Sequence, residues 1–321
     1  LAGRSLLDAQ PVLGLSQPTR QAADWYGQGR LLKTSLISDR RCEPAVRREP
    51  VGPVVDGLTV FAPETCPDRP PGQLFVLGDS HAAANQPMLE HLSAVEGRTV
   101  KVLQVPGCAY IDLMAPMTAD ASPHCHRMAL ASMRTVLAQA SPQDIVFLPS
   151  LRLPRLIELG GAPKPMADDE AYARSTADIV RIRSAAADAP QWLAPFLDAG
   201  MKVVFELPKP VFRAHAFQCV DWFNRRNPDC RGGLEERRAD QERYRAPVVA
   251  AIGELQATYR GVYAWDPLPA LCDATTCSAL RNGRPLYFDG DHVSPYGNLE
   301  LLASFRAQIG QLWEQRHSRS P

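Results

Sequence analysis

The chain has 321 residues, which suits two average domains or one large α/β domain with an extension. Its 35 Lys and Arg residues balance its 35 Asp and Glu residues, so the net charge is zero. This argues against a nucleic-acid binder that neutralises phosphates, and it gives no reason to expect a polybasic membrane surface. With 45% hydrophobic residues the composition is globular, and no apolar run reaches the ~18 residues of a membrane-spanning helix.

Residues 1–71 are rich in proline and weakly periodic. A short helix is expected at Ala23–Tyr26, and the remainder is expected to be an irregular extension or linker. Leu1 is not a natural translation start, and no signal-peptide core follows it. We therefore expect a fragment of a longer protein, or a processed product, with residues 72–321 as its main domain.

From residue 73 onward, short apolar runs alternate with helical stretches. The runs are rich in β-branched and aromatic residues and have the length of strands. The predicted strands are 74–77, 100–105, 145–148, 202–207 and 261–265, and the predicted helices are 82–95, 127–140, 170–199, 234–258 and 295–315. This alternation predicts a parallel central sheet with helices on both faces, a three-layer α/β/α fold. Functional sites in such folds lie at the carboxyl ends of the strands.

The eight cysteines form four local pairs along the chain, and none belongs to a C-x-x-C motif. An even, clustered set favours disulfides and an oxidising compartment, although eight buried thiols of a cytosolic enzyme are the alternative. The expected disulfides are Cys42–Cys66, Cys108–Cys125, Cys219–Cys230 and Cys272–Cys277. His124-Cys125-His126 is not expected to bind zinc, because adjacent side chains diverge and no second cluster has metal-ligand spacing. No metal site is therefore predicted.

The first predicted strand of the main domain runs directly into Gly78-Asp79-Ser80-His81. Gly78 permits a tight turn, so Ser80 is expected where the strand ends and a helix begins. The Ser80 N–H then points out of the helix N-terminus, where an oxyanion is stabilised. Ser80 is thus a candidate nucleophile, with an ordinary helix N-cap as the alternative.

A second candidate segment precedes the last predicted helix, which starts at Ser294-Pro295. His292 lies in this loop, and Asp289 is three residues before it, the spacing at which a turn brings two side chains together. A carboxylate there fixes the imidazole tautomer and leaves the other nitrogen free to accept the Ser80 proton. Asp291 adjoins His292, where side chains diverge, so we expect Asp289 to be the buried partner and Asp291 to be more exposed. A surface histidine and a turn-forming aspartate are the alternatives.

Together these segments resemble the SGNH/GDSL hydrolase superfamily. More closely, the chain resembles the extracytoplasmic SGNH domain that follows a membrane-embedded acyltransferase family three domain in bacterial polysaccharide O-acetyltransferases. The matching residues are Gly78-Asp79-Ser80-His81-Ala82, Pro106-Gly107-Cys108, the Cys272–Cys277 loop and 286–294. The resemblance covers residues 72–316 and implies a flavodoxin-like fold. It also implies Ser80 as nucleophile, His292 as base and Asp289 as the residue that orients the base.

The resemblance further implies an oxyanion hole made by the N–H groups of Ser80 and Gly107. The superfamily usually adds an Asn side chain after the third strand, but here that place reads Phe147-Leu148-Pro149-Ser150-Leu151-Arg152 without Asn. Ser150 and Arg152 are the nearest candidates for a third donor. Otherwise the hole has two donors, which suits slow, partner-assisted transfer better than fast hydrolysis.

We interpret the chain as a serine-dependent O-acyltransferase that acetylates a bacterial surface polysaccharide, such as lipopolysaccharide, through an acyl-serine. The resemblance implies a domain on the periplasmic or extracytoplasmic face of the inner membrane, with acetyl groups delivered by an N-terminal membrane acyltransferase domain. No further cofactor is expected. The alternatives are a secreted carbohydrate acetylesterase and a non-catalytic polysaccharide-binding module with the same fold.

Overall fold

The computed structural model describes residues 41–51, 55–157, 175–220, 227 and 230–315. A seven-stranded sheet forms its centre, in the order β1-β2-β4-β3-β5-β6-β8. Five strands are parallel: β3 (Leu74–Gly78), β4 (Val100–Gln104), β5 (Ile145–Leu148), β6 (Lys202–Glu206) and β8 (Val262–Trp265). Counted along the chain, they take the spatial order 2-1-3-4-5 of flavodoxin-like folds. The order of neighbours reverses between β3 and β5, so a switch point lies at the end of β3.

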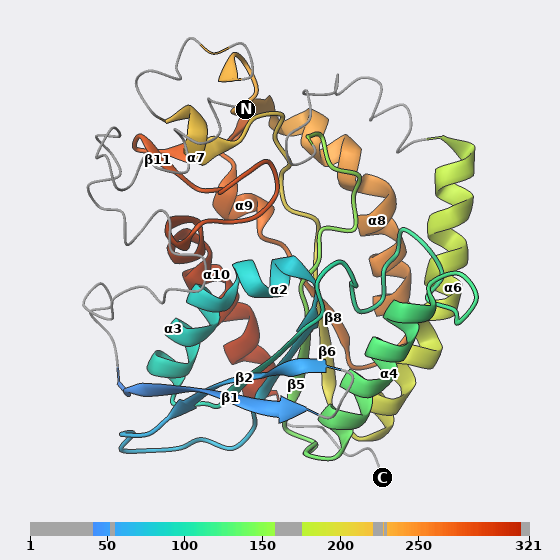
Figure 1. The fold of residues 1–321 in the computed structure, drawn as a ribbon, viewed down its shortest axis with the longest axis vertical. Coiled ribbons are helices and arrows are strands. Elements are labelled where there is room, and N and C mark those ends of the chain that lie inside the picture. The colour runs from blue at the N-terminus through green and yellow to red at the C-terminus, as the bar shows by residue number, and fades with distance from the viewer. Residues whose placement is uncertain (1–40, 52–54, 158–174, 221–226, 228–229, 316–321) are drawn as a thin grey trace.

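Helices cover both faces of this sheet (Figure 1). One face carries α2 (Ser80–Ala84), α3 (Gln86–Glu96) and α10 (Pro295–Glu314), and the other carries α4 (Pro123–Leu137), α6 (Thr176–Asp198) and α8 (Arg238–Thr258). Two short helices, α7 (Ala216–Cys219) and α9 (Leu268–Leu271), lie in the connections. The prediction of a three-layer α/β/α fold with a central parallel sheet is confirmed.

The central strands are buried because both of their faces are covered. Every residue of β3, β5 and β6 is buried. Alternation along β3 divides the core, since Val76 packs with the α3 and α10 side and Phe75 packs with the α4, α6 and α8 side. This packing on both faces holds the carboxyl ends of the strands in fixed positions; the side of the sheet where these ends lie is called its carboxyl edge.

The structure differs from the irregular segment that we expected over residues 1–71. Within it, β1 (Pro44–Val51) and β2 (Val55–Pro63) form an antiparallel hairpin, and β2 pairs with β4. Leu58, Val60 and Phe61 on β2 are buried, so this hairpin adds to the core and covers the edge that β4 would otherwise expose. The short helix expected at Ala23–Tyr26 lies outside the described residues.

Smaller elements complete the loops at the carboxyl edge. The strands β7 (Glu235–Arg237) and β9 (Thr276–Ser278) pair with each other, as do β10 (Leu280–Arg281) and β11 (Arg284–Pro285). The helix expected over 234–258 therefore begins later, at Arg238. None of the helices among the described residues has the length and apolar character needed to cross a membrane.

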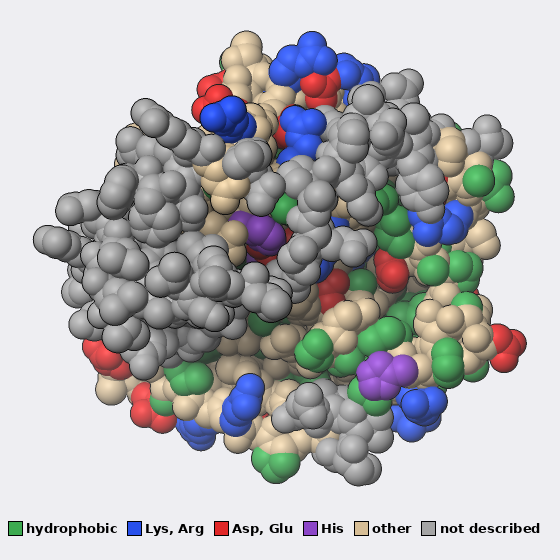
Figure 2. Space-filling model, turned by 45° about the horizontal axis from the view of Figure 1, so that its top comes forward, with side chains coloured by type: hydrophobic (Ala, Val, Ile, Leu, Met, Phe, Trp, Pro, Cys, Tyr) green, Lys and Arg blue, Asp and Glu red, His purple; other side chains and the backbone are tan. Residues whose placement is uncertain are grey.

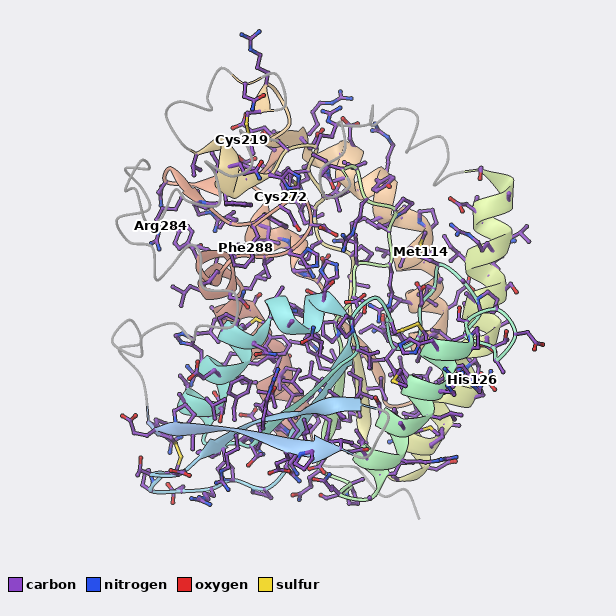
Figure 3. The ribbon with its side chains drawn as sticks, viewed as in Figure 1. Met114, His126, Cys219, Cys272, Arg284 and Phe288 are labelled. Carbon is purple, nitrogen blue, oxygen red and sulfur yellow. A yellow bond between two sulfur atoms is a disulfide. The ribbon has the colours of Figure 1, made fainter. Side chains whose placement is uncertain are left out.

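All eight cysteines are disulfide-bonded in the structure. The pairs are Cys42–Cys66, Cys108–Cys125, Cys219–Cys230 and Cys272–Cys277, the same pairs as expected from the sequence. Figure 3 places Cys219 and Cys272 in the loop-rich part of the molecule and His126 on α4. The pairing of Cys125 with Cys108 removes the thiolate that a zinc site at residues 124–126 would need.

Candidate active site

Ser80 lies at the carboxyl end of β3, beside the switch point of the sheet. Asp79 is the N-cap of α2, and its Oδ1 accepts a hydrogen bond from the His81 main-chain N–H at 2.9 Å. Only glycine fits at position 78, because the Cβ of any other residue would lie 2.4 Å from the carbonyl oxygen of Pro149. This packing of glycine against the neighbouring strand end presents Ser80 on the first turn of the helix.

The loop before α10 brings His292 to Ser80 from the other end of the chain. His292 Nε2 lies 2.7 Å from Ser80 Oγ, and His292 Nδ1 lies 2.8 Å from Asp289 Oδ2. The second oxygen of Asp289, Oδ1, accepts hydrogen bonds from the main-chain N–H groups of Asp291 and His292 at 2.9 and 2.8 Å. These bonds fix the carboxylate, so in the neutral imidazole Nδ1 carries the proton and Nε2 is left to accept one from Ser80. In the view turned toward this edge, Figure 2 shows histidine and acidic side chains in a hollow of the surface.

Asp291 does not have the exposed position that we expected. Its side chain is 5% exposed, against 14% for Asp289, and one of its oxygens lies 3.2 Å from His292 Nδ1. The expectation assumed an extended backbone in which neighbouring side chains diverge. Instead the Phe288 N–H donates to the His292 carbonyl at 2.8 Å, which closes a tight loop and turns both carboxylates toward the ring.

Both carboxylates act on the basicity of His292. Burial lowers the pKa of His292, but hydrogen bonds and negative charge from Asp289 and Asp291 outweigh burial and raise it to about 9. Burial raises the pKa of Asp291, but its contacts with His292 and His81 bring that pKa well below the usual range. The site therefore strongly favours a proton on the imidazole and a charged Asp291.

His81 and Arg155 are part of this site, although neither of them had a predicted role. The ring of His81 stacks on that of His292, with centroids 4.3 Å apart and planes 13° apart. Arg155 Nε lies 2.8 Å from Asp291 Oδ2, as an ionic contact rather than an aligned hydrogen bond. His81 could have been suspected from its place directly after the candidate nucleophile, but nothing in the sequence around Arg155 indicates the contact.

The cluster of His81, Asp291 and His292 has the residue types of a metal site, and its donor atoms lie within 4.8 Å of one another. A metal ion lies in the plane of each imidazole that it binds. Because the two rings are stacked and nearly parallel, no single position lies in both planes. His292 Nδ1 is also hydrogen-bonded to Asp289. The geometry therefore fits a hydrogen-bonded cluster and does not fit a metal centre.

Gly107 lies on the turn after β4, next to the end of β3. The Val105 N–H donates to the Gly78 carbonyl at 2.9 Å, which holds this turn against the strand that carries Ser80. Gly107 has φ of 73°, a conformation that favours glycine, and no atom lies within 4 Å of where its Cβ would stand. The next residue, Cys108, is tied to α4 through Cys125. This position is compatible with the predicted oxyanion donor.

The structure argues against Ser150 and Arg152 as a third oxyanion donor, because their donors are committed elsewhere. Ser150 is 1% exposed, and its hydroxyl donates to the carbonyl oxygen of Pro149 at 2.5 Å. Arg152 is 3% exposed, and its five N–H groups all donate to main-chain carbonyls. The acceptors, at 3.1–3.3 Å, belong to Tyr110, Ile111, Leu148, Ser150 and Glu206. Arg152 thus holds strand ends and the 110–111 loop together.

The chain is similar to one protein family and to several solved structures. The family model described as SGNH domain (fused to AT3 domains) matches residues 48–307. A similar solved structure is the periplasmic domain of a lipopolysaccharide acetyltransferase from Salmonella ser. Paratyphi A, 14% identical, covering 75% of this chain and 85% of that one, with a TM-score of 0.44. Another is a family two carbohydrate esterase from Cellvibrio japonicus, 12% identical, covering 80% and 65%, with a TM-score of 0.41. No curated protein sequence matches the chain.

Proposed function

The chain belongs to the family of SGNH domains that are fused to AT3 domains, and from this premise we propose that it is a serine-dependent O-acetyltransferase. The observation that carries the proposal is the hydrogen-bonded series from Ser80 through His292 to Asp289, with contacts of 2.7 and 2.8 Å. A nucleophile, a base and an orienting carboxylate in this order are the requirements of acyl transfer through a covalent intermediate.

In the first half-reaction, Ser80 Oγ attacks the carbonyl carbon of an acetyl donor while His292 Nε2 takes the hydroxyl proton. The main-chain N–H groups of Ser80 and Gly107 stabilise the oxyanion of the tetrahedral intermediate. The intermediate collapses to acetyl-Ser80, and the protonated His292 returns the proton to the leaving group.

In the second half-reaction, a sugar hydroxyl attacks acetyl-Ser80 while His292 takes its proton. Collapse of the second tetrahedral intermediate releases the acetylated sugar and returns the proton to Ser80 Oγ. The proposed acceptor is a bacterial surface polysaccharide, with lipopolysaccharide as one such polymer. Water in place of the sugar would make the same site an acetylesterase.

The proposed donor is acetyl that an AT3 membrane domain passes across the inner membrane. The family's fusion to AT3 domains supports this partner. The four disulfides support an oxidising compartment, where coenzyme A thioesters made in the cytosol are not at hand. We therefore propose that the domain works on the periplasmic face of that membrane.

The test is to incubate the chain with p-nitrophenyl acetate, with and without purified lipopolysaccharide, and to measure nitrophenolate, acetyl-Ser80 and acetylated sugar by absorbance and mass spectrometry. We expect acetyl-Ser80, and acetylated sugar only when the polysaccharide is present. The Ser80→Ala variant should keep its fold and lose more than nine tenths of the turnover, since the nucleophile is gone. Acetate without acetylated sugar would indicate an esterase, and binding of polysaccharide without acetyl-Ser80 would indicate a binding module.

A further inference from the structure

A second set of charged side chains surrounds the imidazole of His292. We infer that Asp291, held by Arg155 and His81, forms a second support that positions His292 and shares with Asp289 the task of orienting it. This inference rests on the proposed function, because it assigns positioning residues to the same reaction. The inference concerns the residues that hold the imidazole of His292 in position, and it leaves the proposed acyl transfer through Ser80 unchanged.

The two carboxylates converge on one ring nitrogen. His292 Nδ1 lies 2.8 Å from Asp289 Oδ2 and 3.2 Å from Asp291 Oδ1. One N–H can be shared between two acceptors at these distances, and each acceptor alone would select the same tautomer. Loss of either carboxylate therefore leaves an acceptor that still keeps Nε2 free for Ser80.

Asp291 is held in place from two other parts of the chain. Arg155, which follows β5, places Nε 2.8 Å from Asp291 Oδ2, and His81, on α2, places Nε2 3.6 Å from the same oxygen. A carboxylate that is 5% exposed needs such partners to remain charged. The contacts tie the loop before α10 to the helix that carries Ser80.

His81 also limits the movement of the base. Its ring covers one face of the His292 imidazole at a centroid distance of 4.3 Å, and the residue is 2% exposed. Its Nδ1 is buried and lacks a hydrogen-bond partner among the described residues, so the ring is held by stacking and by Asp291. A stacked neighbour restricts rotation of the His292 ring and keeps water from that face.

The charged and titratable groups that face His292 are few in the described part of the chain. Asp289 and Asp291 on its own loop and His81 on α2 contact the ring, and Arg155 after β5 contacts Asp291 behind them. Burial raises the pKa of the Tyr287 hydroxyl, and the negative charges of Glu206 and Asp291 raise that pKa further. Removing the charge of Asp291 therefore takes away one of two negative charges on the imidazole, and we expect the pKa of His292 to fall.

The experiment compares Asp289→Asn, Asp291→Asn and the double variant, in kcat, KM and pH profile with p-nitrophenyl acetate. Each single change should lower kcat less than about 100-fold, and the double change should cost about 10⁴-fold, the loss that follows the equivalent Asp→Asn change in a serine protease. KM should change little, because these groups act on the base. In Asp291→Asn the rise of activity with pH should move to lower pH. A 10⁴-fold loss in Asp289→Asn alone, with normal kcat and pH profile in Asp291→Asn, would overturn the inference.

Two variants of His81 separate its stacking on His292 from its polar contact with Asp291. His81→Phe keeps a ring over His292, and His81→Gln keeps a donor toward Asp291; each should lose part of kcat while KM is retained. Arg155→Gln should shift the pH profile in the opposite direction to Asp291→Asn, because it removes a positive charge near the base. Arg306→Gln is the matched control, since its guanidinium, 40% exposed, pairs with Glu96 at the opposite edge of the sheet. Unchanged kcat and pH profile in Arg155→Gln and in both His81 variants would contradict the second support.

A readout without turnover keeps this inference separate from the proposed function. The pKa and tautomer of His292 can be followed by NMR in protein with labelled histidines, with His292→Gln to assign the signal. We expect a lower pKa in Asp291→Asn and retention of the Nδ1–H tautomer in Asp289→Asn. Absence of acetyl-Ser80 in the unaltered chain would reject the proposed function alone, whereas an unchanged His292 pKa in Asp291→Asn would reject the second support alone.

Discussion

The ammonium group of Lys209 lies 2.7 Å from a carboxylate oxygen of Glu206, and both side chains are 0% exposed. Glu206 is the last residue of β6, so this ion pair lies at the carboxyl edge of the sheet that carries the candidate site. The other oxygen of Glu206 has no hydrogen-bond partner among the described residues. Each charge in this pair is therefore compensated mainly by the other.

Replacing Lys209 by Met is expected to lower the free energy of unfolding by about 3–5 kcal/mol at neutral pH, since it leaves a buried carboxylate without its partner. Urea unfolding measures the change. The double variant Glu206→Leu with Lys209→Met should recover most of the loss, because apolar groups of similar volume carry no desolvation cost. Arg47→Met breaks an exposed pair with Glu64 and should cost less than about 1 kcal/mol. A loss of that small size in Lys209→Met would show that the pair does not stabilise the fold.

Much of the fold follows from periodicity alone. Strands such as β3 and β5 are buried on both faces, so their residues form continuous apolar runs that stand out in the sequence. The β1–β2 hairpin does not stand out. The strand β1 is exposed along most of its length and carries the charged residues Arg47, Arg48 and Glu49. It pairs with β2, whose own place in the sheet is set by its pairing with β4.

The candidate site was predictable where local rules determine it. Asp289 and His292 are three residues apart in a turn, and Ser80 follows a strand end, so their roles could be proposed without coordinates. The prediction that Asp291 is exposed was wrong because the Phe288–His292 hydrogen bond closes the loop, and no residue pattern in the sequence indicates that bond. Arg155 meets Asp291 through a contact between distant segments, which propensity and spacing cannot reveal.

Ser150 and Arg152 are expected to act on stability rather than on the transition state. Ser150→Ala should lower kcat far less than the ~100-fold that loss of an oxyanion donor typically costs. Arg152→Met should lower the free energy of unfolding by at least about 3 kcal/mol, because it leaves several buried carbonyls without a donor. Urea unfolding and p-nitrophenyl acetate kinetics measure the two effects. Arg152→Met protein of normal stability with a 100-fold lower kcat would instead make Arg152 a donor to the oxyanion.

The pH dependence of the reaction should follow the ionisation of His292. The imidazole accepts the Ser80 proton only when it is neutral, and its pKa is raised to about 9. Below that pH the base is mostly protonated, so kcat/KM should rise with pH from neutrality and level off above about 9. Initial rates with an acetyl ester, corrected for spontaneous hydrolysis, provide the measurement. A plateau already reached at pH 7 would show that the two carboxylates do not raise the pKa of this histidine.

The disulfide Cys108–Cys125 lies beside Gly107. Cys108 directly follows the predicted oxyanion donor and is bonded to Cys125 on α4, with a sequence separation of 17 residues. Gly107 has φ of 73° and no neighbouring atom at its Cβ position. The turn is held by the disulfide, by the Val105–Gly78 hydrogen bond and by the Cys108 N–H, which donates to the Val105 carbonyl at 3.0 Å.

Replacing Cys108 and Cys125 together by Ser should therefore lower kcat by more than about tenfold, a substantial part of the 100- to 1000-fold cost of losing one oxyanion donor. It should also lower the free energy of unfolding by about 3 kcal/mol in the chain-entropy description of a loop of this length. KM should change less than kcat, because the oxyanion forms only in the transition state. Replacing Cys42 and Cys66 by Ser is the control, since that disulfide joins the ends of the β1–β2 hairpin, and it should cost stability with little loss of kcat. Equal kcat in both double variants would mean that the turn at Gly107 keeps its geometry without the disulfide.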